Sequence, residues 1–489
     1  MALRDVPLHL DGAARRRLGA WYTPPWLVEG VLDLTLDPVL AARASPTGLR
    51  ILDPACGDGR FLVAAAERLA HRFGGTASDH ARRVHGVDLD AQALAAARAV
   101  LGPGAVLRQA DALTDPWSEA PFDVVVGNPP FLSQLASATA RGGASAIGGG
   151  PYADTAALFL ALATRLVRPG GRVALVLPQS VLSTRDASSL RAEVAARGAV
   201  EALWLAGEAV FDAAVHTCVI VVAVGAHQGP VRRYLGPSFA PLAEATAGAV
   251  AGPTWGPLAA PVIGVPEVKP ETSGVLGDIA GATAGFRDQF YGLAPFVREG
   301  GAGAPLVTCG HIDVGRCRWG DRPVRFARHV HIEPVVDLDA LGATGGRVAR
   351  WVQDRLRPKV VLATQTRVLE AAADIDGRWV PSVPVVSIEP YDPGAVWRVA
   401  AVLTSGVASA WAAATYAGAG LSGAAIKLSA AQVRTLPLPA RPWDAGVAAL
   451  RDGDVAACAN AVDSAYGVDD PTLRAWWRAG AASAGSSAR

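Results

Sequence analysis

Residues 49 to about 225 show a regular alternation of short apolar runs and longer helix-forming segments. This alternation restricts the possible folds more than any other feature of the sequence. The apolar runs are rich in Val, Leu and Ile, and segments such as RFLVAAAERLAHRF and AQALAAARAVL separate them. Repeated strand, helix, strand order predicts an α/β domain with a mainly parallel sheet. The last two runs, VEALWLA and HTCVIVVAV, have no long helix-forming segment between them, which allows an antiparallel strand at an edge.

Acidic residues end the first three predicted strands. Asp53 ends the first strand, and a glycine-rich turn, PACGDG at residues 54–59, leads from it into a helix. Glycine in such a turn lets the backbone pass close to a nucleotide-like ligand. Asp88 and Asp111 end the next two strands, where a carboxylate can accept hydrogen bonds from ribose hydroxyls or from an adenine amino group. Because parallel strands end at one edge of a sheet, these acids predict one ligand crevice.

The segment Asn128-Pro129-Pro130-Phe131 follows a buried strand, FDVVVG. Proline fixes φ and removes a backbone donor, so a carbonyl beside it is held outward as an acceptor. The Asn128 side-chain oxygen offers a second acceptor, and an aromatic amine held by two acceptors becomes pyramidal, with its lone pair directed at an electrophile. Phe131 can stack on a flat base. The segment therefore predicts alkylation of a planar amino group without a strong base.

These motifs together resemble the class I S-adenosylmethionine-dependent methyltransferases, and more specifically the gamma-type adenine-N6 DNA methyltransferases of restriction-modification systems. Upstream, GAWYTP at residues 19–24 resembles the segment that folds over the methionine end of the cofactor in that group, with Trp21 in place of the usual Phe. Downstream, residues 207–217 resemble the segment whose aromatic packs on the second face of the extruded adenine, which makes Phe211 the partner of Phe131.

The resemblance implies a Rossmann-like class I methyltransferase sheet, the cofactor S-adenosyl-L-methionine, no metal, and methylation of adenine N6 in duplex DNA. Asp88 would hold the cofactor ribose and Asp111 its adenine. The catalytic residues it implies are Asn128, Pro129, Pro130 and Phe131. The cofactor-binding residues it implies are Tyr22, Thr23, Pro24, Asp53, Pro54, Ala55, Gly57, Gly59, Asp88, Leu89, Asp111, Ala112 and Asn128. The target base must be flipped from the stack, and Phe131 and Phe211 would stack on it.

The C-terminal half has a different pattern, with short strand-like runs, many arginines and turns, and it resembles the α+β target-recognition domains of such enzymes. We expect a catalytic domain over residues 1–250, a linker over 251–274, a DNA-binding target-recognition domain over 275–440, and a helical segment with a disordered tail over 441–489. LGDI at 276–279 opens the recognition domain, and LPLP at 436–439 closes it. Its arginines are expected to meet phosphates and base edges. The first cluster contains Arg316, Arg318, Arg322, Arg325 and Arg328, of which the first three are predicted to bind the DNA substrate.

Other functions remain open at this point. Protein-glutamine methyltransferases and some rRNA guanine-N2 methyltransferases carry a similar NPPY segment, but the YTP segment and the arginine-bearing C-terminal part argue against them. A non-catalytic DNA-specificity subunit would not need an intact NPPF. An N4-cytosine enzyme usually has Ser in place of Asn128.

Charge and cysteine content limit the remaining partners. The formal net charge is +1, so DNA binding requires a basic face opposed by an acidic one. The five cysteines form no CxxC pair, and the N-terminus has no signal peptide, which fits a reduced, cytoplasmic setting. Polar residues interrupt the uncharged stretch at 399–426, which favours a buried helix over a membrane span. Few residues precede the YTP segment, so we expect a separate restriction endonuclease or defence-system subunit as partner.

Overall fold

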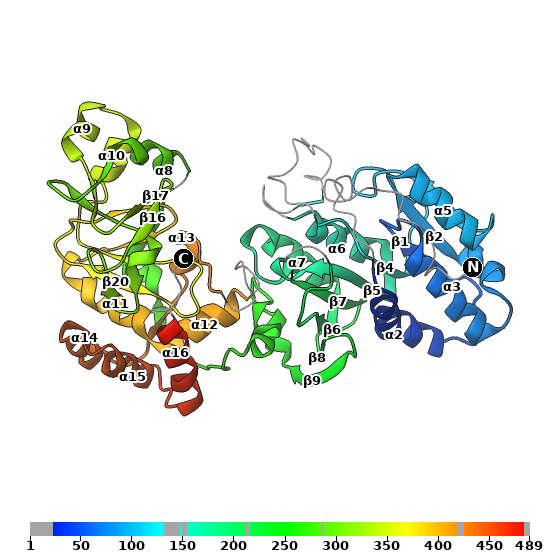
Figure 1. The fold of residues 1–489 in the computed structure, drawn as a ribbon. Helices are drawn as coiled ribbons and strands as arrows, with labels where there is room; N and C mark the ends of the chain where they lie inside the picture. Colours follow the sequence, from blue (N-terminus) through cyan, green and yellow to red (C-terminus); the bar gives the residue numbers. More distant parts are fainter. Residues whose placement is uncertain are drawn as a thin grey trace. The chain divides into compact units, whose positions relative to one another are not determined.

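The chain divides into two compact units, Met1–Val262 (unit 1) and Ile263–Arg489 (unit 2) (Figure 1). The computed structural model describes residues 23–131, 147–148, 154–211, 216–285, 287–417 and 425–483. The division falls inside residues 251–274, which the sequence analysis assigned to a linker. The first half of that stretch packs on unit 1: Trp255 is fully buried, and its backbone N–H donates to the carbonyl of Leu182 at 2.7 Å. The domain bounds given from the sequence stay a prediction.

The described part of unit 1 is built on a nine-stranded sheet with the order β3-β2-β1-β4-β5-β7-β6-β8-β9. Strands β3, β2, β1, β4 and β5 are parallel, and β7 is antiparallel to both β5 and β6. Of the last two apolar runs, the antiparallel one, β7, therefore lies inside the sheet between β5 and β6, while the edge is formed by β9, which is antiparallel to β8. The strands are β1 (Ile51–Asp53), β2 (Val84–Asp88), β3 (Val106–Gln109), β4 (Phe122–Gly127), β5 (Val167–Pro178), β6 (Gly198–Leu205), β7 (Thr217–Val224), β8 (Val231–Leu235) and β9 (Ala240–Ala245).

Helices cover both faces of this sheet. Side chains alternate along β4, so Val124 and Val126 join a core cluster that includes residues of α2, α3 and α5, while Val125 turns to the opposite face. Helices α6 and α7, whose residues are absent from that cluster, contact β4, β5 and β6. The helices are α2 (Pro25–Ala41), α3 (Arg60–Phe73), α4 (Ala77–His80), α5 (Ala91–Leu101), α6 (Thr155–Leu166) and α7 (Ser188–Arg197).

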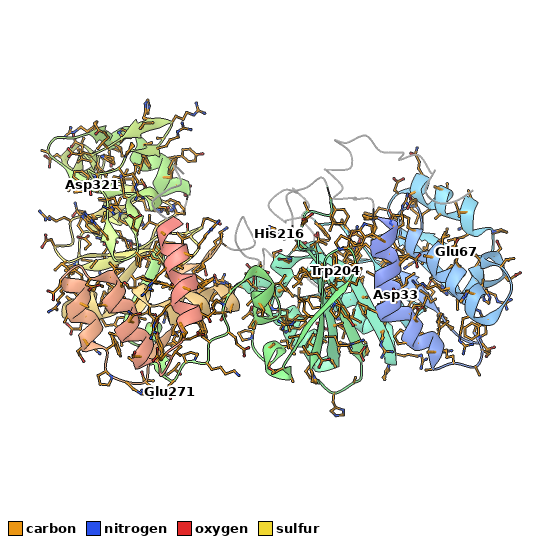
Figure 2. The ribbon with its side chains drawn as sticks, turned by 60° about the horizontal axis from the view of Figure 1, so that its bottom comes forward. Asp33, Glu67, Trp204, His216, Glu271 and Asp321 are labelled. Atoms are coloured by element: carbon orange, nitrogen blue, oxygen red, sulfur yellow. The ribbon has the colours of Figure 1, made fainter. Side chains whose placement is uncertain are left out.

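Aromatic packing fixes α2 on the sheet. The ring of Trp204 on β6 is fully buried, with its centroid 5.8 Å from Trp26 on α2 and 5.3 Å from Phe239, on which it stacks (Figure 2). A side chain at Gly30 would meet the Phe239 ring at 2.1 Å, so only glycine allows this contact. Because Thr23 lies two residues before Pro25, where α2 starts, this packing also determines where the YTP segment ends.

Unit 2 consists of short, mostly antiparallel strands and a set of C-terminal helices. One sheet has the order β11-β22-β19-β20 and another the order β12-β18-β13-β21. The segments expected to open and close this region meet directly, because β10 pairs with β23 and the N–H of Leu276 donates to the carbonyl of Leu436 at 2.7 Å. The strands are β10 (Thr272–Val275), β11 (Ala280–Ala284), β12 (Val297–Glu299), β13 (Ala304–Val307), β14 (Ile312–Asp313), β15 (Arg316–Cys317), β16 (Val324–Phe326), β17 (His329–His331), β18 (Pro334–Val336), β19 (Lys359–Leu362), β20 (Ala371–Asp374), β21 (Val380–Pro381), β22 (Val386–Pro390) and β23 (Pro437–Pro439).

The helices of unit 2 correct one expectation, the disordered tail, and bear on a second, the uncharged stretch at 399–426. Helix α16 continues to Ser483, so the beginning of the tail expected to be disordered is helical, since its alanines favour helix. Within the described ranges, no single helix is long and apolar enough to cross a membrane; the helical segments Pro393–Thr404 and Gly406–Thr415 meet that requirement only as a pair bent by 66°. The helices are α8 (Arg287–Leu293), α9 (Leu338–Ala343), α10 (Arg347–Gln353), α11 (Val396–Thr404), α12 (Gly406–Thr415), α13 (Ala430–Val433), α14 (Asp444–Arg451), α15 (Val455–Ala465) and α16 (Pro471–Ser483).

Candidate active site

The carboxyl ends of β1, β2 and β4 bring the first sequence motifs together. These strands are neighbours in the sheet, so Asp53, Asp88 and the Gly127–Asn128 corner share one edge. A Cβ placed on Gly127 would lie 2.5 Å from the Asp53 carboxylate oxygen Oδ1. Only glycine at position 127 therefore lets the end of β4 pass beside this carboxylate, a requirement that sequence reasoning missed.

Backbone amides of the glycine-rich turn donate to these carboxylates. The N–H of Ala55 donates to Asp53 Oδ1 at 3.0 Å, and the N–H of Gly57 donates to Asp88 Oδ2 at 2.8 Å. Gly57 and Gly59 adopt positive φ angles of 52° and 86°, which glycine tolerates best. A Cβ on Gly57 would meet no atom within 4 Å. The turn thus passes beneath open space in which a ligand can lie against the backbone.

Burial makes this edge of the sheet electrostatically unusual. Desolvation, followed by the nearby charges of Asp88 and Asp58, raises the pKa of Asp53 to about 8. Desolvation also raises the pKa of Asp88, although it accepts hydrogen bonds from backbone amides. Within the described residues, neither Asp53 nor Asp88 forms an ion pair. A buried and a half-buried carboxylate without a cation favour a positively charged ligand between or beside them.

The remaining residues assigned to the cofactor line the end of the sheet nearest β3. Leu89 follows β2 and is 64% exposed, while its carbonyl accepts from Gln109 Nε2 at 3.1 Å. Asp111 is half-buried and accepts the N–H of Leu113 through Oδ1 at 3.0 Å. Ala112 is buried, so it can shape the crevice only through its small side chain and its backbone. Pro54 is buried and directly follows Asp53 in the turn.

A hydrogen bond joins the NPPF segment to Thr23 of the YTP segment. Asn128 Nδ2 donates to Thr23 Oγ1 at 3.0 Å, across 105 positions of sequence. Thr23 is buried, and Asn128 is half-buried at the end of β4. Because the amide nitrogen is directed at Thr23, the amide oxygen faces the other way. Sequence reasoning placed Thr23 and Pro24 beside the cofactor but missed this partnership, which separate motifs cannot reveal. Tyr22 lies outside the described residues.

Phe131 and Phe211 lie next to each other, as the pairing inferred from the resemblance requires. Their ring centroids are 6.1 Å apart, and the ring planes meet at 75°. Pro129 is buried, whereas Pro130 and Phe131 are half-buried. In this edge-to-face arrangement a flat base does not fit between the rings, so one ring must turn or move before both can stack on it. Stacking on a base by both rings stays a prediction.

The three arginines assigned to the DNA substrate have partners within unit 2. Arg322 binds Asp313 through two hydrogen bonds, Nη1 to Oδ1 at 3.0 Å and Nη2 to Oδ2 at 2.9 Å. Arg318 Nε donates to the same carboxylate at 2.9 Å. Arg316 is 60% exposed and lies 3.8 Å from Asp321. In the described structure Arg318 and Arg322 therefore hold the turn between β14 and β16, and the predicted contacts with DNA stay a prediction.

Comparisons with known proteins agree with the geometry of unit 1. Residues 10–232 match a family model described as N-6 DNA Methylase. The Type II methyltransferase M.TthHB8I of Thermus thermophilus is 32% identical over 212 residues, which cover 40% of this chain and 42% of that protein. The adenine-specific methyltransferase PglX of Streptomyces coelicolor is 35% identical over 106 residues, 20% of this chain and 9% of that protein. The matches thus span less than half the length of these curated relatives.

A solved structure extends the likeness of fold to both units. The Type IIL restriction-modification enzyme MmeI, solved in complex with DNA, aligns with 98% of this chain and 80% of its own with a TM-score of 0.59. The sequence identity is 15%, so this likeness concerns the fold alone. Together with the sheet order of unit 1, it confirms the α/β fold class expected from the sequence.

Proposed function

We propose, from the match of residues 10–232 to a family model described as N-6 DNA Methylase, that this chain transfers a methyl group to the N6 amino group of a flipped adenine in duplex DNA. The observation that carries the proposal is Asn128, held by Thr23 at the end of β4, on the sheet edge that it shares with the buried Asp53 and the half-buried Asp88. The relative from Thermus thermophilus, itself a Type II methyltransferase, supports the same reaction class.

The residues at the strand ends fit S-adenosylmethionine as the methyl donor. The open space above Gly57 accommodates a ligand that lies against the turn, and the buried acids favour its cationic groups. Asp88 and the turn would hold its ribose and methionine parts, and Leu89 and Asp111 its adenine. When bound, the donor supplies an electrophilic methyl group with a good leaving group.

Asn128 would act on the amino group of the target base. Its side-chain oxygen accepts one N6 hydrogen, and a carbonyl at the proline corner accepts the other, which pyramidalises the nitrogen. The nitrogen gains the methyl group and loses one proton to water, so the chain needs no strong base. Flipping the adenine costs a few kcal/mol, and stacking on Phe131 offsets about 1–3 kcal/mol of that cost.

The biological setting follows from this reaction. The chain would act on double-stranded DNA in a restriction-modification or phage-defence system, with a separate endonuclease or defence subunit as partner. We propose the cytoplasm as its location, because its DNA substrate and its cysteines, which form no CxxC pair, suit a reducing compartment.

Long-read sequencing of DNA from cells that express the chain tests the proposal. Wild type should leave N6-methyladenine in one sequence context, and Asn128→Ala should remove that signal, because loss of one preorganised acceptor costs roughly 10²–10³ in rate. Asn460→Ala, an asparagine on α15 of unit 2, is the matched control and should leave the signal unchanged. A wild-type protein that is folded and binds the donor but leaves no N6-methyladenine would overturn the proposal.

A further inference from the structure

The hairpin formed by β16 and β17 carries an uninterrupted positive segment. Residues 322–332, RPVRFARHVHI, contain three arginines and two histidines and no acidic residue. Arg325, Arg328 and His329 are exposed. Asp321 and Glu333 stand immediately before and after this segment, and Figure 2 labels Asp321 in the light green part of unit 2. The positive charge is therefore concentrated toward the hairpin turn and the negative charge at its base.

One face of the hairpin is anchored and the other is presented to solvent. Val324 and Phe326 are buried, and the Phe326 ring lies 4.8 Å from that of Phe290 on α8. By alternation, Arg325 points to the opposite face, where its cross-strand neighbour is Val330. Val330 is 64% exposed, which is unusual for an apolar residue in a strand. A cation and an apolar side chain thus share one outward surface on a fixed support.

The turn of this hairpin has a backbone conformation that residues with a side chain rarely adopt. Ala327 and Arg328 connect the two strands with positive φ angles of 45° and 73°. Two-residue turns of this kind normally contain Asn or Gly, because a Cβ makes the left-handed region costly. Glycine at position 328 would relax the backbone but remove the cation. Strain of this kind concentrates at functional sites.

The other arginines of this cluster are engaged within the fold, in contrast to the two at the turn. Arg318 and Arg322 bind Asp313, and Arg316 lies near Asp321. Among the residues that the structure describes, no acid forms an ion pair with Arg325 or Arg328. The nearest acid across the base, Glu299, accepts the backbone N–H groups of Ile332 and Glu333 and lies 3.2 Å from His331. The charge at the tip is therefore uncompensated.

We propose that the β16–β17 hairpin is a DNA-contacting element of unit 2, with Arg325 and Arg328 as its principal contacts. This inference rests on the proposed function, since it takes duplex DNA as the partner. A two-stranded ribbon fits the major groove, which is about 12 Å wide, and arginine binds phosphates or guanine edges there. Val330, beside Arg325, suits apolar contact with a thymine methyl group.

The test measures binding of the full-length chain to a fluorescein-labelled duplex of mixed sequence over a range of salt concentrations. Arg325→Ala/Arg328→Ala should weaken binding about tenfold or more and lower the salt slope by roughly one for each phosphate that the variant no longer neutralises. Arg378→Ala is the matched control, because this exposed arginine of unit 2 pairs with Asp376, and it should bind as wild type. Arg325→Lys/Arg328→Lys, which keeps both charges, should recover most of the affinity and excludes a folding defect.

Two results separate this inference from the proposed function. If wild type methylates adenine and the double alanine variant, with an unchanged Tm, binds DNA and methylates as wild type does, the hairpin proposal is wrong while the function stands. If the double alanine variant binds DNA more weakly than wild type, but wild type never forms N6-methyladenine, the proposed function is wrong while the hairpin proposal stands.

Discussion

Two carboxylates of unit 1, Asp53 and Asp88, and two of unit 2, Asp313 and Asp374, have opposite environments. In unit 1, Asp53 and Asp88 lie at the strand ends with backbone amides as partners and, among the described residues, no cation. In unit 2, Asp313 binds two arginines, and the buried Asp374 binds the fully buried Lys359. A buried acid without a cation costs stability, whereas a paired one supports a specific fold. The difference indicates that Asp53 and Asp88 are available to a ligand, whereas Asp313 and Asp374 hold the chain together.

The arginines show the complementary difference. Arg68 on α3 binds three acids of α2, Glu29, Asp33 and Asp37, and so joins these two helices of unit 1. At the β16–β17 turn of unit 2, Arg325 and Arg328 have no such partner among the described residues. Residue type alone therefore does not identify a binding residue, and the presence or absence of an internal partner does. The following substitutions test this distinction from the largest expected effect to the smallest.

Asp53→Asn should show the largest effect, as a change in the pH dependence of stability. The folded pKa of about 8 lies above the ordinary value of 3.8, so folding favours the protonated acid. Between these two pKa values the folded protein binds the proton more tightly than the unfolded chain does. The free energy of unfolding of wild type therefore falls relative to that of the variant as the pH rises from about 4 to 8. The Tm of the variant should accordingly exceed that of wild type by an increasing margin over this range, with reduced methyl transfer. A margin that does not change with pH would mean that Asp53 has no unusual environment.

Asp88→Ala should weaken binding of S-adenosylmethionine about 10- to 100-fold by isothermal titration calorimetry. It removes a charged acceptor of the Gly57 amide and of the cofactor ribose, and such bonds contribute about 1.5–3 kcal/mol each. Asp90→Ala is the control: Asp90 caps α5 through the N–H of Gln92 at 2.8 Å, so its loss should lower stability but not affinity. Equal affinity losses in the two variants would contradict the assignment.

Asp313→Ala should destabilise unit 2 by about 1–2 kcal/mol, because it leaves Arg318 and Arg322 without their carboxylate partner. The expected loss is modest because both arginines are partly exposed and water can solvate them. Differential scanning calorimetry should show a lower unfolding temperature for unit 2, while the affinity of the chain for S-adenosylmethionine stays the same. An unchanged transition with weaker DNA binding would indicate instead that Asp313 serves the DNA interface and not the fold.

Thr23→Val should lower kcat about fivefold, close to 1 kcal/mol, because it removes the acceptor that orients Asn128. Affinity for DNA should change little, and Thr23→Ser, which keeps the hydroxyl, should restore kcat. If serine fails to restore the rate although the protein is folded, the hydrogen bond to Asn128 does not position the amide.

The arrangement of the strand ends in unit 1 was predictable from the sequence because parallel strands end at one edge of a sheet, whereas the roles assigned to the residues there stay a prediction. Asp53, Asp88 and Asn128 each follow a recognisable strand, so their proximity follows from topology. The contacts between residues of different motifs could not be predicted in the same way. The Asn128–Thr23 bond joins residues 105 positions apart, and β7 lies inside the sheet because of long-range pairing. The edge-to-face packing of Phe131 and Phe211 likewise depends on contacts between distant segments.

Unit 2 was less predictable because its short strands depend on turns. The Ala327–Arg328 turn has neither Asn nor Gly, so composition gives no signal for a two-residue hairpin. The partners of Arg318 and Arg322 likewise come from a turn that brings Asp313 beside them. The α+β character of the domain and the arginine cluster could be recognised in the sequence. Which of these arginines pair with acids within the fold could not be recognised there.

The central claim is that the Asn128 corner presents acceptors to the amino group of adenine. The most direct measurement is mass spectrometry of nucleosides from DNA incubated with this chain and S-adenosylmethionine that carries an isotopic label in its methyl group. We predict label in N6-methyl-2′-deoxyadenosine for wild type and its loss in Asn128→Ala. Label in cytosine, in guanine or in protein, or labelling of adenine that Asn128→Ala leaves unchanged, would contradict the claim.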